Sequence, residues 1–293
     1  MYAIIGATGN TGHVVADQLL DAGLPVRVIG RSEDRLASFV ERGAEPAVGD
    51  VSDADFVAQA CDGAGGVYSL LPPLFHVDLR KWQGQVSRAI VAGIRAAGVP
   101  YVVNLSSVGA QHHEGTGPIV GLREHEDRLN ELSETNVLHL RPAWFMENLY
   151  AMMEGVRAMG ALATPIRDDV PIAFIATRDI GAEAAHRLAA LDFDGHHTKE
   201  LLGPREYTMP EVASILGEAI GEPDLPYVVA PEEAMSSALL AAGLHAATVE
   251  TVLELYRGFN ERLIVAREER TPANTTPTTL EEFAAEMAAA HTG

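Results

Sequence analysis

The chain has 293 residues, 47% of them hydrophobic, and 41 acidic against 21 basic side chains give it a formal net charge of −20. A negative field of this size repels nucleic-acid phosphates, and a single cysteine, Cys61, excludes an intrachain disulfide and a cysteine-based metal site. No apolar run approaches the roughly 18 residues of a membrane helix and no signal-peptide pattern opens the chain, so we expect a cytoplasmic protein that binds neither nucleic acid nor membrane.

The first expected element is a short buried strand at residues 2–5, followed by three glycines at a spacing of three. Gly6 allows a sharp turn, Gly9 allows a diphosphate to approach the backbone, and Gly12 allows the following helix to pack close to the strand. The free N–H groups and the positive end of that helix would then face the phosphates. We therefore expect a dinucleotide to be held by Gly6, Thr8, Gly9, Asn10, Thr11 and Gly12.

A second strand is expected at residues 24–29 and a helix at residues 33–42, with Ser32 as its N-cap. NAD-preferring folds usually have an Asp or Glu at this strand end, where it binds the ribose 2′-hydroxyl, but this chain has Gly30 and Arg31. A guanidinium here can bind a 2′-phosphate bidentately and stack on adenine. We expect NADP(H) to be preferred over NAD(H); the alternative is an ordinary surface arginine at the start of a helix.

The next two strands are expected at residues 44–49 and 66–71. Asp50 follows the first of them and can either contact the adenine amino group or cap the helix at residues 53–60. Two prolines end the other strand abruptly. The residues expected to contact the cofactor here are Asp50, Val51, Leu70, Leu71 and Pro72, and those expected to line the mouth of a substrate site are Phe75 and His76.

A long amphipathic helix at residues 78–97 precedes two more strands, at residues 101–107 and 137–142. The alternation of strands and helices predicts an α/β fold, a Rossmann-type doubly wound parallel sheet with right-handed crossovers. Ligands bind such sheets at the carboxyl ends of the strands, near the point where the strand order reverses. Ser106 and Pro142 are therefore further expected cofactor contacts.

We expect residues 1–150 to form the nucleotide-binding domain, and residues 151–293 to form a small C-terminal α/β lobe over the substrate cleft, with some segments returning to the sheet. Further helices are expected at residues 179–191, 211–220, 230–243 and 248–263, and a terminal helix after a capping-box pattern at residues 278–284.

A methionine-rich helix is expected at residues 145–159. Methionines at helical spacing usually fill a core, but beside the nicotinamide they would form an adaptable apolar wall. Phe145, Met146 and Tyr150 are accordingly expected to contact the substrate.

Four stretches together resemble the NmrA-like branch of the atypical short-chain dehydrogenase/reductase superfamily. They are residues 6–12, Arg31, residues 141–149 and residues 278–283, and the third is the most specific for this branch. The resemblance implies NADP(H) binding in the N-terminal Rossmann domain and a substrate cleft under the C-terminal lobe. Members of the branch include quinone reductases, azo-dye and triphenylmethane-dye reductases, and non-catalytic NADP(H) sensors.

The chain departs from the wider superfamily at its catalytic pair. Classical members use Tyr-x-x-x-Lys, in which the lysine lowers the pKa of the tyrosine so that it can shuttle a proton. This chain has two lysines, Lys81 and Lys199, and neither lies four residues after a tyrosine. What remains is hydride transfer that needs little acid catalysis, with a reactive acceptor held against the nicotinamide in a dry pocket.

Three residues are candidates for a catalytic role. His125 occupies a position that resembles the polar residue of the quinone-reductase-like members; it can donate a proton, orient the nicotinamide ribose, or lie on a helix surface beside two glutamates. Ser107 can hydrogen-bond substrate or ribose, or cap the strand end. Tyr150 lies one helical turn past Met146 and can face the cleft or pack in the core.

These observations favour an NADPH-dependent oxidoreductase that reduces a small electron-poor acceptor, such as a quinone, an azo compound or a conjugated carbonyl or imine compound. The missing Tyr/Lys pair also allows a non-catalytic NADP(H) sensor acting through a protein partner, and makes a sugar-nucleotide epimerase the weakest candidate. A small molecule is the expected partner, with a homodimer as a possible assembly. The histidine pairs at 112–113 and 196–197 lie in expected loops without zinc-type spacing, so no metal is expected.

Overall fold

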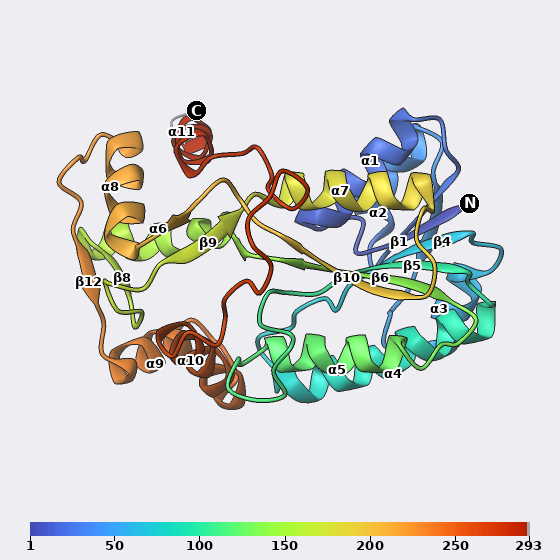
Figure 1. Ribbon diagram of the computed structural model, residues 1–293, viewed down its shortest axis with the longest axis horizontal. Helices are drawn as coiled ribbons and strands as arrows, with labels where there is room; N and C mark the ends of the chain where they lie inside the picture. The colour runs from blue at the N-terminus through green and yellow to red at the C-terminus, as the bar shows by residue number, and fades with distance from the viewer. Residues whose placement is uncertain (292–293) are drawn as a thin grey trace.

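The computed structural model describes residues 1–291 and is built on a parallel β-sheet (Figure 1). Within those residues the sheet has seven strands in the order β10-β6-β5-β4-β1-β2-β3, and all neighbouring pairs are parallel. The strands are β1 (Tyr2–Ile5), β2 (Val26–Gly30), β3 (Glu45–Val48), β4 (Gly66–Ser69), β5 (Tyr101–Leu105), β6 (Asn136–Pro142) and β10 (His196–Leu201). The predicted Rossmann-type doubly wound fold is confirmed.

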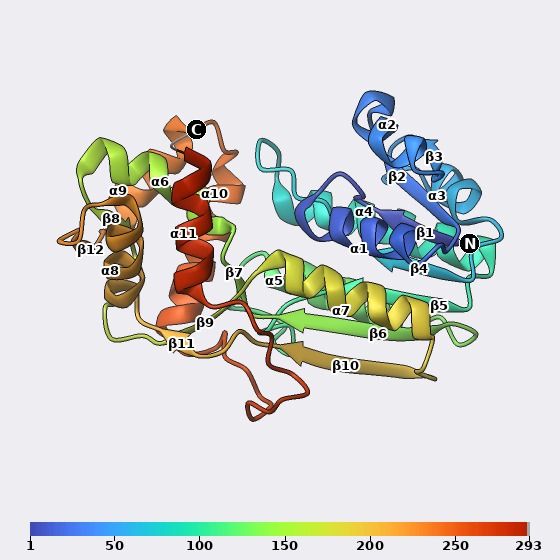
Figure 2. The same cartoon turned by 90° about the horizontal axis from the view of Figure 1, so that it is seen from above.

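Helices cover both faces of the sheet, as Figures 1 and 2 show. The helices of one face are α1 (Asn10–Asp21), α2 (Glu33–Glu41) and α7 (Thr177–Ala190). The helices of the other face are α3 (Ala54–Cys61), α4 (Leu79–Ala97) and α5 (Ile119–Leu129). α1 packs on α7, and α4 packs on both α3 and α5, so packed helices cover each face of the sheet.

The inner strands are short and mainly apolar because both of their faces are buried, whereas the edge strands β3 and β10 are largely exposed. Alternate residues of β1 point to opposite faces, so that Ile4 joins the core under α1 whereas Ala3 and Ile5 join the core under α4. Tyr68 and Val67 of β4 divide between the two cores in the same way. A slip of one residue would exchange the two sets, so the two cores fix the register and with it the loops at the strand ends.

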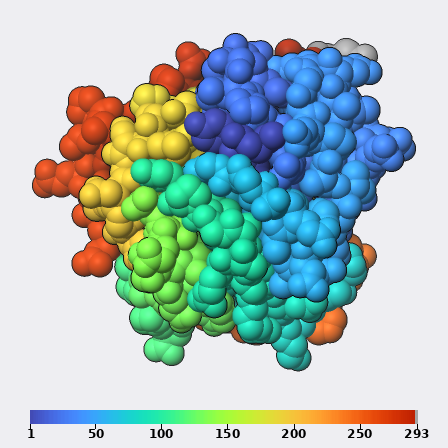
Figure 3. Space-filling view, turned by 90° about the vertical axis from the view of Figure 1, so that its right-hand side faces the viewer, coloured from blue at the N-terminus to red at the C-terminus, as the bar shows by residue number. Residues whose placement is uncertain are grey.

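A lobe lies beyond the carboxyl ends of the strands, on the left in Figure 1. Its strands form the small sheets β11-β9-β7 and β12-β8, and they are β7 (Trp144–Phe145), β8 (Leu162–Thr164), β9 (Ile172–Ile175), β11 (Glu206–Tyr207) and β12 (Tyr227–Val229). Its helices are α6 (Asn148–Met159), α8 (Met209–Ile220), α9 (Glu232–Ala241), α10 (Ala246–Asn260) and α11 (Leu280–His291). Figure 3 shows the opposite end of the molecule, where the surface comes mainly from the sheet domain and the lobe appears only at the margins.

The chain crosses between the two parts more than once. After a first segment in the lobe, the chain returns to the sheet domain. There α7 packs on α1, and β10 pairs with β6 along its whole length. The sequence pattern placed His196 and His197 in a loop, but they begin strand β10. They are exposed because β10 is an edge strand of the sheet.

Three helix starts differ from the sequence-based expectation. Asp53, rather than Asp50, caps α3, and its side chain accepts hydrogen bonds from two backbone N–H groups of the first turn at 2.9 and 3.3 Å. Ser32 occupies the N-cap of α2 but makes no side-chain cap hydrogen bond. The methionine-rich helix begins later than predicted, at Asn148, because β7 takes up the preceding stretch of chain.

The capping box predicted near the end of the chain is present. The Thr279 hydroxyl accepts a hydrogen bond from the Glu282 N–H at 3.1 Å, and the Glu282 carboxylate accepts one from the Thr279 N–H at 3.0 Å. Helix α11 starts there and packs on α8. Across residues 1–291, none of the helices combines the length and the apolar character needed to cross a bilayer.

Candidate functional site

The carboxyl edge of the sheet contains the point where the strand order reverses. β1 and β4 are neighbours there, and the chain runs outward from β1 to β2 and β3 but from β4 to β5 and β6. In open α/β sheets, ligands bind at such a point. The expected cofactor residues lie at or just after the ends of strands β1 to β6, so the fold brings them to this one edge.

The glycine loop after β1 has the geometry of a tight turn into a helix. Gly6 has a φ of +71°, a value that favours glycine, and its carbonyl accepts a hydrogen bond from the Gly9 N–H at 2.9 Å. A Cβ on Gly12 would lie only 2.3 Å from the Gly6 oxygen, so glycine is required for α1 to pack this closely. Gly9 and Asn10, at the start of α1, are exposed and leave the helix N-terminus open to an anion.

The two threonines of the loop have protein partners. The hydroxyl of Thr11 is buried and accepts a hydrogen bond from the Tyr68 hydroxyl at 2.9 Å, and burial raises the pKa of Tyr68. The Thr8 carbonyl accepts a hydrogen bond from the Arg35 guanidinium at 3.1 Å. The Thr11 side chain therefore anchors the loop to β4. The loop can contact a phosphate through its backbone N–H groups.

Two arginines lie beside this loop. Arg31 follows β2 directly and is exposed, and its guanidinium makes no hydrogen bond or ion pair within the part of the chain that the structure describes. Arg35, on the first turn of α2, is also exposed and reaches the loop through Thr8. Sequence reasoning singled out Arg31 and missed Arg35, because Arg35 reaches the loop only through the fold.

The remaining expected cofactor residues lie further along the edge. The side chain of Leu70 is the nearest neighbour that a Cβ on Gly6 would meet, at 3.1 Å. Leu71 is buried, and the Pro72 carbonyl accepts a hydrogen bond from the Trp82 indole N–H at 2.8 Å. The last expected residues are Asp50, whose carboxylate accepts a hydrogen bond from the Ser52 N–H at 2.8 Å, half-buried Val51, and buried Pro142.

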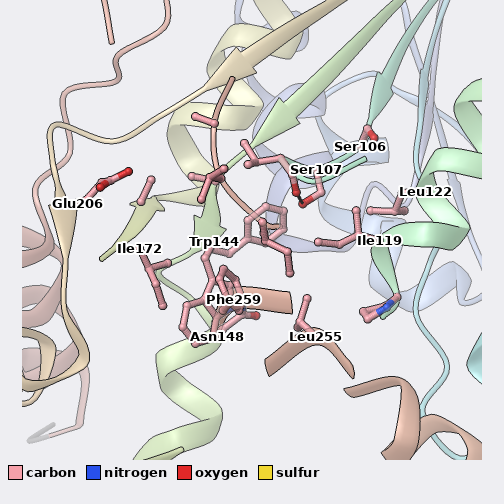
Figure 4. A pocket seen from close by; sticks show the side chains of 18 of the residues that line it. Ser106, Ser107, Ile119, Leu122, Trp144, Asn148, Ile172, Glu206, Leu255 and Phe259 are labelled. Atoms are coloured by element: carbon pink, nitrogen blue, oxygen red, sulfur yellow. Dashed lines mark hydrogen bonds between the residues drawn. The ribbon is translucent and has the colours of Figure 1, made fainter. Parts of the chain in front are cut away.

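A cavity of about 250 Å³ lies beyond the ends of β5 and β6, between the sheet domain and the lobe (Figure 4). Apolar side chains from α5, β7, β9, α10 and residues 264–266 form most of its wall. The polar residues that line it are Ser106, Ser107, Asn148 and Glu206. A small, mainly apolar cavity with a few polar groups is typical of a binding site for a small organic molecule.

Aromatic side chains form one wall of this cavity. The ring of Trp144 stacks on Phe174, with centroids 5.2 Å apart, and lies 5.2 Å from the ring of Phe259 on α10. Phe145, the next residue of β7, also lines the cavity. Of these residues, sequence reasoning named only Phe145, because Trp144 and Phe259 meet through the tertiary fold.

The serines at the end of β5 mark the sheet side of the cavity (Figure 4). The Ser107 hydroxyl donates a hydrogen bond to the Val108 carbonyl at 2.9 Å. Ser106 is 2% exposed, and its hydroxyl has no hydrogen-bond partner within the described residues. An unsatisfied buried hydroxyl is costly, so a polar atom of a bound molecule would stabilise this one.

Four other expected site residues lie away from the cavity. Met146 is fully buried in the core, and Tyr150 is 42% exposed on α6; neither lines the cavity. The strand β7 interrupts the expected helix, so the helical spacing that placed these two on one face does not apply. Phe75 and His76 lie on the exposed loop between β4 and α4, and they too are outside the cavity lining.

His125 lies inside the protein and not on a helix surface. Its side chain is 0% exposed, with Nε2 lying 3.1 Å from the Ser69 hydroxyl and Nδ1 lying 2.9 Å from the Ser87 hydroxyl. Burial, with smaller effects of His139 and Arg128, lowers its pKa to about 3, so the ring is neutral at physiological pH. The imidazole links β4 to α4 and does not line the cavity, which corrects the helix-surface alternative.

Metal-binding side chains are not gathered at this edge. Among residues 1–291, no group of three or more His, Cys, Asp and Glu side chains could hold a metal ion. The pair His112 and His113 lies in the connection between β5 and α5.

Comparisons with known proteins agree with this geometry. The model of the NmrA-like family matches residues 2–284. An NAD(P)H azoreductase of Xenophilus azovorans is 27% identical over 258 residues, which cover 87% of this chain and 86% of that one. Quinone oxidoreductase 2 of Escherichia coli is 25% identical over 248 residues, covering 83% and 82%. The crystal structure of an Escherichia coli NADPH-dependent quinone oxidoreductase with NADPH is similar to this structure, with a TM-score of 0.80. The two chains are 22% identical, and the match covers 98% of this chain and 99% of that one.

Proposed function

The chain belongs to the NmrA-like family, and we propose that it is an NADPH-dependent oxidoreductase that transfers hydride to a small electron-poor organic acceptor. Quinones, azo compounds and conjugated carbonyl or imine compounds form the acceptor class. The relatives named for azo and quinone reduction support this class.

One observation carries the proposal: the apolar cavity and the glycine loop lie at the same edge of the sheet. The Ser106 hydroxyl lines the cavity without a partner, as expected where a bound molecule supplies the missing polar atom. A nucleotide held along this edge and an acceptor in the cavity would therefore be neighbours, which is the arrangement that hydride transfer needs.

The residues at the strand ends fit the coenzyme. The Gly6–Gly12 loop would hold its diphosphate, because the close packing at Gly12 and the open N-terminus of α1 leave backbone N–H groups facing outward. The exposed guanidinium groups of Arg31 and Arg35 would bind the 2′-phosphate, which favours NADP(H) over NAD(H). When bound, NADPH supplies the hydride of its nicotinamide ring.

The residues of the cavity would then position the acceptor. Trp144 and Phe259 offer aromatic surfaces against which a flat ring can stack and from which water is excluded. Ser106 and Ser107 would hydrogen-bond the acceptor oxygen or nitrogen that gains charge as hydride arrives. The acceptor takes two electrons with the hydride and one proton from water, so a buried acid is not required. His125 would act as a positioning residue that holds β4.

The direct test mixes the purified protein with NADPH and a panel of quinones, azo dyes and conjugated ketones. We expect the near-ultraviolet absorbance of NADPH to fall only when an acceptor is present, with an equal amount of reduced acceptor formed. A protein that binds NADPH tightly but reduces no member of the panel would contradict the proposal.

The second candidate is a sensor that binds NADP(H) without turnover and acts through a protein partner. The absence of a Tyr-x-x-x-Lys pair from the sequence favours it, since a sensor needs no proton-transfer residues. A sensor predicts a nucleotide-dependent change in assembly or partner binding without turnover. Cytoplasmic location and a homodimer remain predictions.

A further inference from the structure

The cavity contains one charged lining residue, Glu206, within the described part of the chain. Glu206 lies on β11 directly opposite Ala173 of β9, which also lines the cavity. Directly paired residues share a face of the sheet, so the carboxylate side chain and Ala173 lie on the same side. Figure 4 shows Glu206 at one end of the cavity and Ser106 and Ser107 toward the other, with the ring of Trp144 between them.

The charge of Glu206 is not neutralised by its neighbours. Its carboxylate makes no hydrogen bond or ion pair with any described residue. The adjacent Arg205 has its guanidinium 3.7 Å from the centre of the Tyr207 ring and is paired with Glu211 and Glu281. The side chain of that arginine also donates a hydrogen bond to the Glu206 carbonyl at 3.2 Å, and the Glu206 carboxylate has no ion-pair partner among the described residues.

An arginine next to the lining residue Pro171 is engaged by a protein group as well. Arg262 donates a hydrogen bond to the carbonyl of Pro171 at 2.7 Å and is not part of the cavity lining. The lining therefore combines an apolar and aromatic middle, two hydroxyls at one end and a single negative charge at the other. Glu206 is exposed, so its charge acts on a bound molecule from the solvent-facing end of the cavity, where solvent weakens the interaction without abolishing it.

We propose that Glu206 makes this cavity select acceptors that carry a positive charge or an N–H donor at the end remote from the reacting atom. Acceptors with a carboxylate or sulfonate at that end are disfavoured by the same charge. This inference rests on the proposed function, because it assigns a specificity to the same cavity.

The test uses three para-naphthoquinones of similar size whose side arm ends in a trimethylammonium, a neutral amide or a sulfonate group. The quantity compared is the ratio of kcat/KM for the cationic acceptor to that for the anionic one, measured with NADPH at physiological ionic strength, where charges more than about 8 Å apart are screened. We expect this ratio to fall by about 10-fold in Glu206→Gln, since one charge interaction near the surface changes each kcat/KM by up to about 5-fold in opposite directions.

Two further variants separate a local effect from a general one. Glu269→Gln removes the same charge from an exposed residue that does not line the cavity, and it should leave the ratio unchanged. Glu206→Asp keeps the charge and should keep most of the selectivity. A ratio that falls equally in Glu206→Gln and Glu269→Gln, or that falls in neither, overturns the inference.

A binding measurement keeps this test independent of turnover. Trp144 lines the cavity and is one of two tryptophans, so quenching of its fluorescence reports the dissociation constants of the three quinones. If neither these quinones nor any other acceptor of the panel is reduced, the proposed function fails, but the ratio of dissociation constants still decides the role of Glu206. If the quinones are reduced and neither ratio depends on Glu206, the inference alone fails.

Discussion

At Gly12, a missing side chain decides how closely helix α1 can approach strand β1. The limiting contact is with the carbonyl oxygen of Gly6, only six residues earlier in the chain. Such constraints act between near neighbours, which is why the loop could be predicted from its sequence. The wall of the cavity could not be predicted in this way, since Trp144 and Phe259 are more than a hundred residues apart and only the fold brings them together.

The selectivity for the phosphorylated coenzyme is a prediction about Arg31. In Arg31→Asp, a negative charge would replace the guanidinium that we expect to bind the 2′-phosphate. The affinity for NADPH should fall by about 100-fold and that for NADH by less than about 5-fold, because a charge-assisted pair is lost and a repulsion is added for NADPH alone. Titration calorimetry with both nucleotides measures the two effects.

The matched control for this prediction is Arg95→Asp. Arg95 is exposed in the last turn of α4, and that end of the helix lies toward the amino ends of the strands, away from the glycine loop. Arg95→Asp makes the same change in net charge as Arg31→Asp and should leave the affinities for NADPH and NADH nearly unchanged. Equal losses for NADPH and NADH in Arg31→Asp would show that Arg31 does not recognise the phosphate.

Among the elements, α5 and β6 are joined by a buried ion pair. The guanidinium of Arg141 donates two hydrogen bonds to the Glu126 carboxylate, at 2.9 and 2.5 Å, and both side chains are buried. The next residue of β6, Pro142, accepts a hydrogen bond from the N–H of Val108, which lines the cavity. The pair therefore supports the strand end that carries part of the cavity.

Removing one member of this pair should destabilise the protein strongly. Arg141→Met leaves the carboxylate of Glu126 buried without its partner, and we expect the free energy of unfolding to fall by about 3–5 kcal/mol. The double variant Glu126→Gln/Arg141→Met should recover more than half of that loss. Urea unfolding followed by circular dichroism measures both changes.

An exposed pair provides the comparison for this prediction. Lys81 is 86% exposed and pairs with Asp78 at 3.0 Å, so Lys81→Met should cost less than about 1 kcal/mol. If Arg141→Met costs no more than Lys81→Met, the buried pair has no special importance for stability.

The strand β10 was not predicted from the sequence, and its residues show why. Its sequence, residues 196–201, is mostly polar, and it lies at an edge of the sheet. Glu200, the last but one residue of the strand, is nevertheless buried, and its carboxylate accepts hydrogen bonds from the N–H groups of Arg267 and Glu268 at 2.8 and 2.9 Å. Arg267 and Glu268 lie much later in the chain, so no local sequence pattern predicts their hydrogen bonds to Glu200.

For the whole molecule, two buried neutral histidines predict how stability depends on pH. His125 has its pKa lowered to about 3 and His139 to about 4, in both cases mainly by burial. In the unfolded chain both should titrate near the usual pKa of about 6.5. Below that pH the unfolded state binds more protons than the folded state, so the free energy of unfolding falls as the pH decreases toward 4 and is fully present above pH 7.

The expected slope is roughly 1 kcal/mol per pH unit for each histidine between about pH 6 and pH 4. Urea unfolding at a series of pH values measures it. Carboxylates also contribute to acid unfolding, so the informative quantity is the difference between the wild type and His125→Gln, whose slope should be smaller. His113→Gln, at an exposed position, should leave the slope unchanged; equal slopes for all three proteins would contradict the prediction.

At this scale the sequence was a good guide to the sheet and to the helices α8, α9, α10 and α11 of the lobe, and a poor one to the strands of the lobe. The inner strands of the sheet, from β1 to β6 except the edge strand β3, are buried on both faces and so appear as mainly apolar runs separated by helices. The strands of the lobe are only two to four residues long, too short to show an apolar pattern, whereas its helices are long enough to show helical spacing.

The return of α7 and β10 to the sheet limits how this architecture can be divided. Cutting the chain at residue 150 would strip α1 of the helix that covers it and β6 of its neighbouring strand. An engineer who wished to graft this pocket onto another coenzyme scaffold would have to transplant two insertions, roughly residues 143–176 and those after 201, around a retained helix and strand. Evolution faces the same restriction, so new specificities in this architecture should arise by substitution within the lobe more readily than by exchange of whole modules.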